Sequence, residues 1–237
     1  MSDSKKKELL RFAPTNNWRA EDQRLYDKGH QVKLYNHGIK CYVGCNGAGK
    51  STLLEQIESK LKQKGFIEVK SHKNPFRSIL SDNDDFKGYM LHFTSDFEIN
   101  DDLNNFFIDH YMLTARSTGE TLFARFGSAA KFIGEYARKA KEMNVPLVIM
   151  WDDCDVGTSI DVQDEIVEFV KFIKKELSKL GINYSIVLTA NSYELCKSFK
   201  CYDCTTSKRV TFCDYDAYKN FVLSTRKKKD ARDNIHS

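Results

Sequence analysis

Proline is scarce in this chain of 237 residues, where Pro14, Pro75 and Pro146 are the only three. No linker rich in glycine and serine, no internal repeat and no low-complexity tract interrupts the sequence. Boundaries between domains commonly fall in segments of that composition. We therefore expect a single domain over residues 1–237.

The chain also lacks long hydrophobic runs. None approaches the about 20 apolar residues that a membrane-spanning helix needs. The first residues, Met-Ser-Asp-Ser-Lys-Lys-Lys, lack the apolar stretch of a secretory signal. We expect a cytoplasmic protein without direct membrane insertion, in which most of the seven cysteines are free thiols.

Two further patterns are too weak to define a site. Four cysteines near the C-terminus include only one C-x-x-C pair, and this spacing favours thiols over a zinc site. Those cysteines are Cys196, Cys201, Cys204 and Cys213. The net charge of +4 is small, and basic residues cluster at the two ends, at 5–7 and 226–229. Basic tails are commonly solvated, so DNA stays a possible partner without support from charge alone.

One segment carries a complete phosphate-binding motif. Residues 44–51 satisfy G-x-x-x-x-G-K-[ST], directly after the apolar run Ile39–Val43 and before a helical pattern. Glycines let backbone N–H groups close on phosphates, Lys50 reaches the β and γ oxygens, and the Ser51 hydroxyl ligates Mg²⁺. The residues assigned to nucleotide binding are Gly44, Cys45, Asn46, Gly47, Ala48, Gly49, Lys50, Ser51 and Thr52.

Two acids end a second apolar run, Pro146–Trp151. Asp152 is placed to hold the Mg²⁺ that accompanies a nucleoside triphosphate. Asp153 is placed to orient, or take a proton from, the attacking water. The motifs thus predict ATP and Mg²⁺ as cofactors, since no guanine-reading Asn-Lys-x-Asp pattern is present.

The remaining pattern alternates strands with helices. Strands are expected at 66–69, 88–94 and 182–190, and helices at 102–113, 120–143 and 161–180, the last ended by Gly181. The Gly127-Ser128 pair could divide the helix at 120–143. A short helix from Ser192 and a hairpin around 201–213 complete the series. Together they predict an α/β fold, with a largely parallel sheet covered by helices on both faces.

Asp152-Asp-Cys-Asp-Val-Gly-Thr-Ser-Ile-Asp161 resembles the Walker B and D-loop segment of the ABC-type ATPases. Ser117-Thr-Gly-Glu120 resembles the family's signature motif in its Ser-x-Gly-Glu form, and Asn191 stands at the family's switch position. The resemblance covers residues 39–195 with the motifs in the family's order. It implies a P-loop NTPase with a helical signature lobe near 100–145 and a C-terminal hairpin and basic tail at 200–237.

The resemblance further implies that ATP is bound between two protomers. Ser117, Gly119 and Glu120 of one copy, with Asp161, would meet the nucleotide of the other, so the chain would act as an ATP-dependent homodimer switch. Lys50, Asp153 and Asn191 then form the catalytic set.

This sequence departs from the family pattern at two positions. Asp153 replaces a glutamate and Asn191 replaces a histidine, so slow turnover is compatible with the sequence. The Ser-x-Gly-Glu form favours soluble ATPases of the SMC-like, DNA-repair or defence-associated kind over transporter subunits. A DNA-linked role follows by analogy, and a protein partner is possible. The alternatives are a nucleotide-gated binding module with negligible turnover and a transporter motor subunit.

Overall fold

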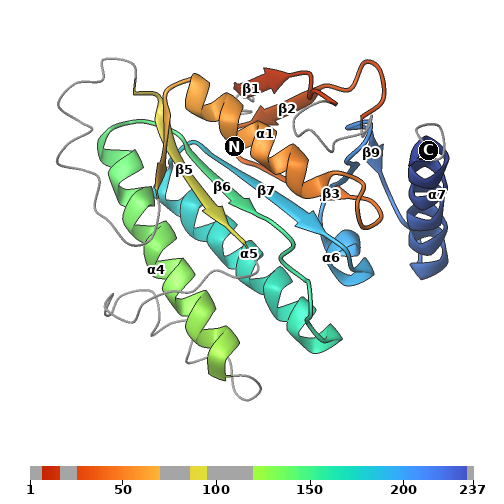
Figure 1. Ribbon diagram of the computed structural model, residues 1–237. Helices are drawn as coiled ribbons and strands as arrows, with labels where there is room; N and C mark the ends of the chain where they lie inside the picture. The colour runs from red at the N-terminus through yellow and green to blue at the C-terminus, as the bar shows by residue number, and fades with distance from the viewer. Residues whose placement is uncertain (1–6, 17–25, 70–85, 95–119, 234–237) are drawn as a thin grey trace.

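The computed structural model describes residues 7–16, 26–69, 86–94 and 120–233, of which 120–125, 128, 232 and 233 are described by their backbone alone. Within these residues an α/β architecture is seen (Figure 1). The elements follow in chain order as β1 (Glu8–Phe12), β2 (Val32–Tyr35), β3 (Gly38–Val43), α1 (Lys50–Gln63), β4 (Phe66–Val69), β5 (Gly88–Phe93), α4 (Glu120–Glu142), β6 (Leu147–Trp151), α5 (Ile160–Leu180), β7 (Tyr184–Ala190), α6 (Tyr193–Ser198), β8 (Cys201–Asp203), β9 (Arg209–Val210) and α7 (Tyr215–Asp233).

A central sheet organises the described residues. Its strand order is β4-β5-β6-β7-β3-β8-β9, with every neighbouring pair parallel except β8 and β9. The mostly parallel sheet and its flanking helices confirm the predicted α/β class. β1 and β2 form a separate antiparallel pair.

Side chains alternate between the two faces of this sheet. Leu147 and Ile149 of β6 pack with α4 and α5, whereas Val148 and Met150 pack with α1 and the β1–β2 pair. A strand buried on both faces reads as a continuous apolar run, because neither face meets water. This explains why the sequence identified β6 so clearly.

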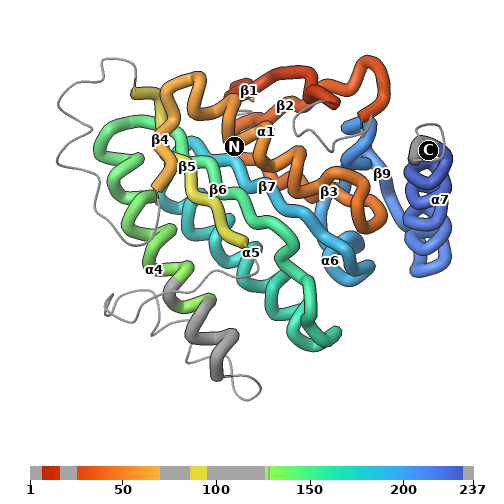
Figure 2. The backbone as a smooth tube through the Cα atoms, viewed as in Figure 1, coloured from red at the N-terminus to blue at the C-terminus, as the bar shows by residue number. Residues whose placement is uncertain are grey.

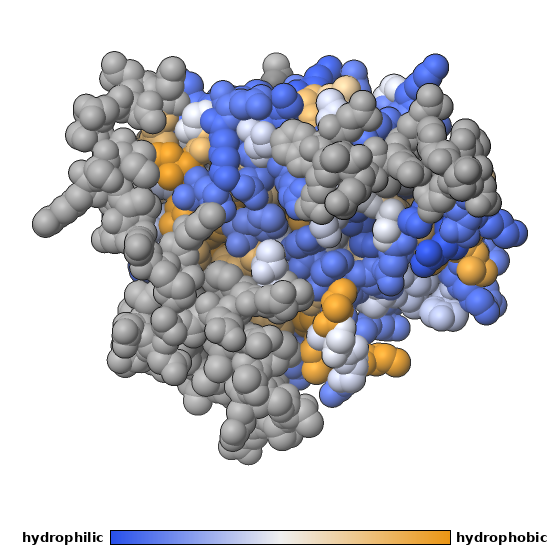
Figure 3. Space-filling view, viewed as in Figure 1, coloured by the Kyte–Doolittle hydropathy of each residue, from blue (hydrophilic) through white to orange (hydrophobic). Residues whose placement is uncertain are grey.

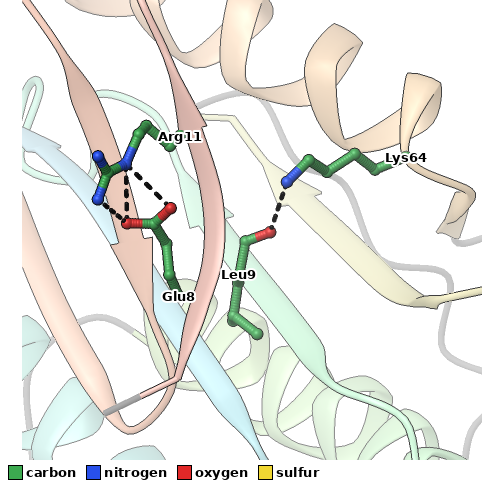
Figure 4. A network of polar contacts seen from close by, with 4 residues as sticks. All are labelled: Glu8, Leu9, Arg11 and Lys64. Carbon is green, nitrogen blue, oxygen red and sulfur yellow. Dashed lines mark hydrogen bonds and ion pairs between the residues drawn. The ribbon is translucent and has the colours of Figure 1, made fainter.

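The β1–β2 pair is joined to the main layer at the end of α1 (Figure 4). Lys64 donates from Nζ to the carbonyl oxygen of Leu9, over 3.3 Å. On the same strand Arg11 pairs with Glu8 through an Nη2–Oε2 contact of 2.7 Å. The ion pair is exposed, so the buried Leu10 and Leu34 carry most of the packing here.

The helices predicted at 120–143 and 102–113 differ in their outcome. α4 is continuous from Glu120 to Glu142, so the proposed break at Gly127-Ser128 is wrong. A single glycine costs a helix interior only about 1 kcal/mol, and the buried Phe126, Ala130 and Ile133 hold this helix against the sheet. The expected helix at 102–113 lies outside the described residues. No described helix is long and apolar enough to cross a membrane.

The start of β5 supplies a test of this packing. A Cβ at Gly88 would lie 2.6 Å from the Pro146 carbonyl oxygen and 2.7 Å from Phe66 Cε1. We expect Gly88→Ala to lower the free energy of unfolding by about 2 kcal/mol, because backbone atoms cannot move aside easily. Urea denaturation measures the change. The neighbouring exposed Lys87→Ala should cost less than about 0.5 kcal/mol, and equal losses for the two variants would contradict the packing argument.

Candidate functional site

The phosphate loop leaves β3 and enters α1 in the conformation that its glycines allow. Gly47 and Gly49 have φ values of +78° and +88°, which residues with a side chain rarely adopt. At Gly44 the reason for glycine is space, because a Cβ there would lie 2.9 Å from Cys204 Sγ. The helix N-terminus that follows directs its first N–H groups toward the loop, as a bound phosphate requires.

Lys50 is buried inside this loop. Its side chain is 6% exposed, and Nζ lies 3.4 Å from the Gly44 carbonyl oxygen and 3.3 Å from that of Cys45. Behind the loop, the Tyr26 hydroxyl donates to the Gly49 carbonyl oxygen over 2.9 Å. The lysine amine is therefore held at the centre of the loop before any ligand arrives.

The two acids follow β6, and a threonine of β7 fixes both. Thr189 Oγ1 accepts from the Asp153 N–H and donates to Asp152 Oδ1, each over 2.6 Å. Thr189 is fully buried, so this hydroxyl is a rigid part of the sheet. Sequence reasoning did not single out Thr189, since a threonine inside a strand carries no distinctive pattern.

Asp153 and Asn191 are brought into direct contact. Asn191 Nδ2 donates to Asp153 Oδ1 over 2.9 Å. Burial, and then the negative charge of Asp152, raise the pKa of Asp153, while the Asn191 hydrogen bond and the charge of Lys50 oppose that shift. An apolar cavity of about 90 Å³ adjoins Asp153. Lys50 and Asp153 thus lie within electrostatic reach of each other.

A third acid, Asp155, joins the segment that follows β6 to the segment that follows β7. Its carboxylate is 5% exposed and accepts the N–H of Asn191 over 2.8 Å and that of Ser192 over 2.6 Å. Sequence reasoning missed this role, although an aspartate two residues after the acid pair was the available signal. Asp155 sets the position of Asn191 relative to Asp153.

Some of the residues expected to contact the nucleotide of a second copy lie outside the described part of the chain. Ser117 and Gly119 lie outside the described residues, and α4 begins at Glu120, whose side chain is not described. Asp161 is exposed on the first turn of α5, where it accepts a hydrogen bond from the Ser159 hydroxyl. The signature and D-loop assignments therefore stay predictions.

The metal assignments involve two oxygen donors. The Ser51 side chain is partly exposed at the start of α1, and the Asp152 carboxylate is half-buried at the end of β6. Among the described residues no group of three His, Cys, Asp or Glu side chains could hold a metal ion. The C-terminal cysteines are among the residues that form no such group. A Mg²⁺ ion carried by a nucleotide needs no such group, because phosphate oxygens and water supply most of its ligands.

Comparison with known proteins shows a likeness to solved structures. No protein-family model matches the chain, and no curated protein matches it. A solved structure with a similar arrangement is CbiO1 from Clostridium perfringens, described as part of the ABC transporter complex CbiONQ. The two share 14% sequence identity over 94% of this chain and 92% of that chain, with a TM-score of 0.40. A likeness of that degree does not define a family.

Asp155 offers a test of how the site is held together. We expect Asp155→Ala to lower the free energy of unfolding by about 3 kcal/mol, because two backbone N–H groups lose a buried charged acceptor. Chemical denaturation measures this change. The exposed Asp164→Ala on α5 is the matched control, with an expected loss below about 0.5 kcal/mol. A loss for Asp155→Ala as small as that of the control would show that the carboxylate does not hold Asn191.

Proposed function

We propose that this chain is an ATP-binding and ATP-hydrolysing P-loop ATPase of the ABC type. The observation that carries the proposal is the position of Lys50, buried in a glycine-rich loop at a helix N-terminus and within electrostatic reach of Asp153. A buried lysine amine beside the N–H groups of a helix N-terminus is an environment that attracts the negative charge of a triphosphate. ATP rather than GTP rests on the absence of Asn-Lys-x-Asp from the sequence.

The residues present fit a magnesium nucleotide. Ser51 and Asp152 offer hard oxygen donors, the kind that Mg²⁺ prefers, and Thr189 occupies Oδ1 of Asp152 through its hydroxyl. When bound, the ion would neutralise charge on the phosphate oxygens. The chain's own part is to orient the Asp152 carboxylate through the Thr189 hydrogen bond.

Asp153 and Asn191 are suited to hold the attacking water. Among the described residues, Asn191 Oδ1 is buried and has no hydrogen-bond partner. A water that donates one proton to this oxygen and the other to Asp153 would satisfy both acceptors. Asp153 would then take a proton from the water as the water oxygen attacks the γ-phosphorus, and the bond from that phosphorus to the bridging oxygen would break, with ADP as the leaving group.

Dimerisation is the second part of the proposal. Val156 and Ile160, in the segment after the acid pair, are 52% and 69% exposed. Figure 3 shows apolar surface where α5 begins, below a largely hydrophilic face. Exposed apolar side chains beside a charged site favour burial against another surface, and Asp161 lies in the same segment. A second copy of the chain, presenting residues 117–120, is the proposed cover.

The process that such an ATPase drives is proposed by analogy with soluble members of the family, in a DNA-linked setting such as repair, mobile-element biology or defence. The motor subunit of a transporter is the alternative that the same fold would serve. A binding module with negligible turnover is the other alternative, and it is favoured by one observation: the Asn191 amide already engages the Asp153 carboxylate.

The first test removes the phosphate-loop amine. We expect Lys50→Ala to weaken ATP binding roughly 30- to 100-fold, the loss of a charge-assisted contact, and to abolish phosphate release. Calorimetry and a steady-state phosphate assay measure the two effects. Lys60→Ala, on the same helix, should match the wild type. Wild-type ATP binding with phosphate release no higher than that of Lys50→Ala would favour the binding module.

The second test addresses the dimer. We expect Asp153→Asn to bind MgATP but not hydrolyse it, because the amide cannot take the proton, and so to accumulate as a dimer. Light scattering with and without MgATP measures the mass. A monomer of this variant at saturating MgATP would be incompatible with the shared site. Duplex DNA added to the wild-type assay, at two salt concentrations, tests the DNA-linked role, since binding to phosphates weakens as salt rises.

A further inference from the structure

The C-terminal helix α7 presents one stripe of residues to the nucleotide site. Tyr218, Val222, Thr225 and Lys229 are spaced by four, three and four positions, so they lie on one face of the helix. α7 stands beside the sheet edge that carries β9, next to the turn between β3 and α1 (Figure 2). Three members of the stripe make contacts with the candidate site.

Tyr218 contacts the switch side of the site. Its hydroxyl donates to the carbonyl oxygen of Asn191, and its side chain is only 8% exposed. The Tyr218 ring also packs edge-on against Phe212, with centroids 5.3 Å apart. The start of α7 is thereby fixed to the residue that touches Asp153.

Thr225 contacts the phosphate loop. The Cys45 N–H donates to Thr225 Oγ1 over 3.0 Å, and the hydroxyl donates in turn to the Val222 carbonyl oxygen over 2.8 Å. Thr225 is 3% exposed. This buried hydrogen bond joins residues 180 positions apart and fixes the position of α7 along the phosphate loop.

Lys229 lies at the rim of the same loop. A Cβ built on Gly47 would be 2.8 Å from Lys229 Cε and 3.8 Å from its Nζ. The end of the Lys229 side chain therefore lies against the backbone of the phosphate loop at Gly47. Lys229 is half-buried, whereas Arg226, Lys227 and Lys228 on the same helix are exposed. The basic cluster at 226–229 therefore divides into one lysine that lies against the phosphate loop and three exposed cations.

We propose that Lys229 is a second phosphate-binding lysine of the nucleotide site, supplied by α7 of the same chain. This inference rests on the proposed function, because it names a further ligand-binding residue of that site. A triphosphate carries more negative charge than the Lys50 amine neutralises, and a cation at the loop rim adds attraction over several ångströms. Thr225 and Tyr218 are positioning residues that hold the helix at the required place.

The experiment compares two lysines of one helix. ATP and AMP affinities are measured by calorimetry for the wild type, Lys229→Ala, Lys229→Glu, Lys229→Arg and the matched control Lys228→Ala. We expect Lys229→Ala to weaken ATP binding about tenfold and Lys229→Glu to weaken it further. The affinity for AMP, which carries fewer charges, should fall less than the affinity for ATP. Lys229→Arg should retain ATP affinity, and Lys228→Ala should change ATP affinity less than about twofold.

The outcomes separate this inference from the function on which it rests. If Lys50→Ala loses ATP binding while Lys229→Ala behaves like Lys228→Ala, the role of Lys229 is overturned and the ATPase assignment stands. If the wild type binds no ATP, the proposed function itself is contradicted, whatever the Lys229 variants do. Thermal unfolding of each variant is the structural control. Alanine has the best helix propensity, so a fall in ATP affinity at unchanged melting temperature would assign the effect to the charge.

Discussion

The pairing of β7 with β6 on one side and β3 on the other is the constraint on which the site depends. β7 is buried along its whole length, and its register places Trp151 beside Leu188 and Val43 beside Ala190. All three strands therefore end at the same edge of the sheet. The phosphate loop, the acid pair and Asn191 meet because each follows one of these strands directly.

The same strand also orients the two acids that follow β6. Thr189 uses one hydroxyl to receive the Asp153 N–H and to donate to Asp152, so the two neighbouring carboxylates are directed differently although they are adjacent in sequence. Asp155 then holds the chain after β7 by its backbone N–H groups. The orientation of Asp152, Asp153 and Asn191 is thus a property of packing between segments about 36 residues apart.

The sequence predicts the parts of this fold that have strong local patterns. β4 has the predicted bounds, and α5 differs from its prediction only by one residue at its start, because an amphipathic helix repeats a simple period. Gly181 ends α5 with φ +73°, as a glycine there predicts. The roles of Thr189, Asp155 and Lys229 have no such pattern. Each depends on contacts with residues remote in sequence. The sequence of α7 is too polar to predict which face of this helix is buried.

The backbone at Asp153 favours a short acidic side chain at this point. Asp153 has φ +46°, in the left-handed region, where aspartate and asparagine are tolerated better than longer side chains because they bond locally. The left-handed conformation at Asp153 accompanies the hydrogen bond of its N–H to Thr189 and the contact of its carboxylate with Asn191. Asp153 and Asn191 therefore form one hydrogen-bonded unit, in which the left-handed backbone at Asp153 helps to place the carboxylate beside the amide.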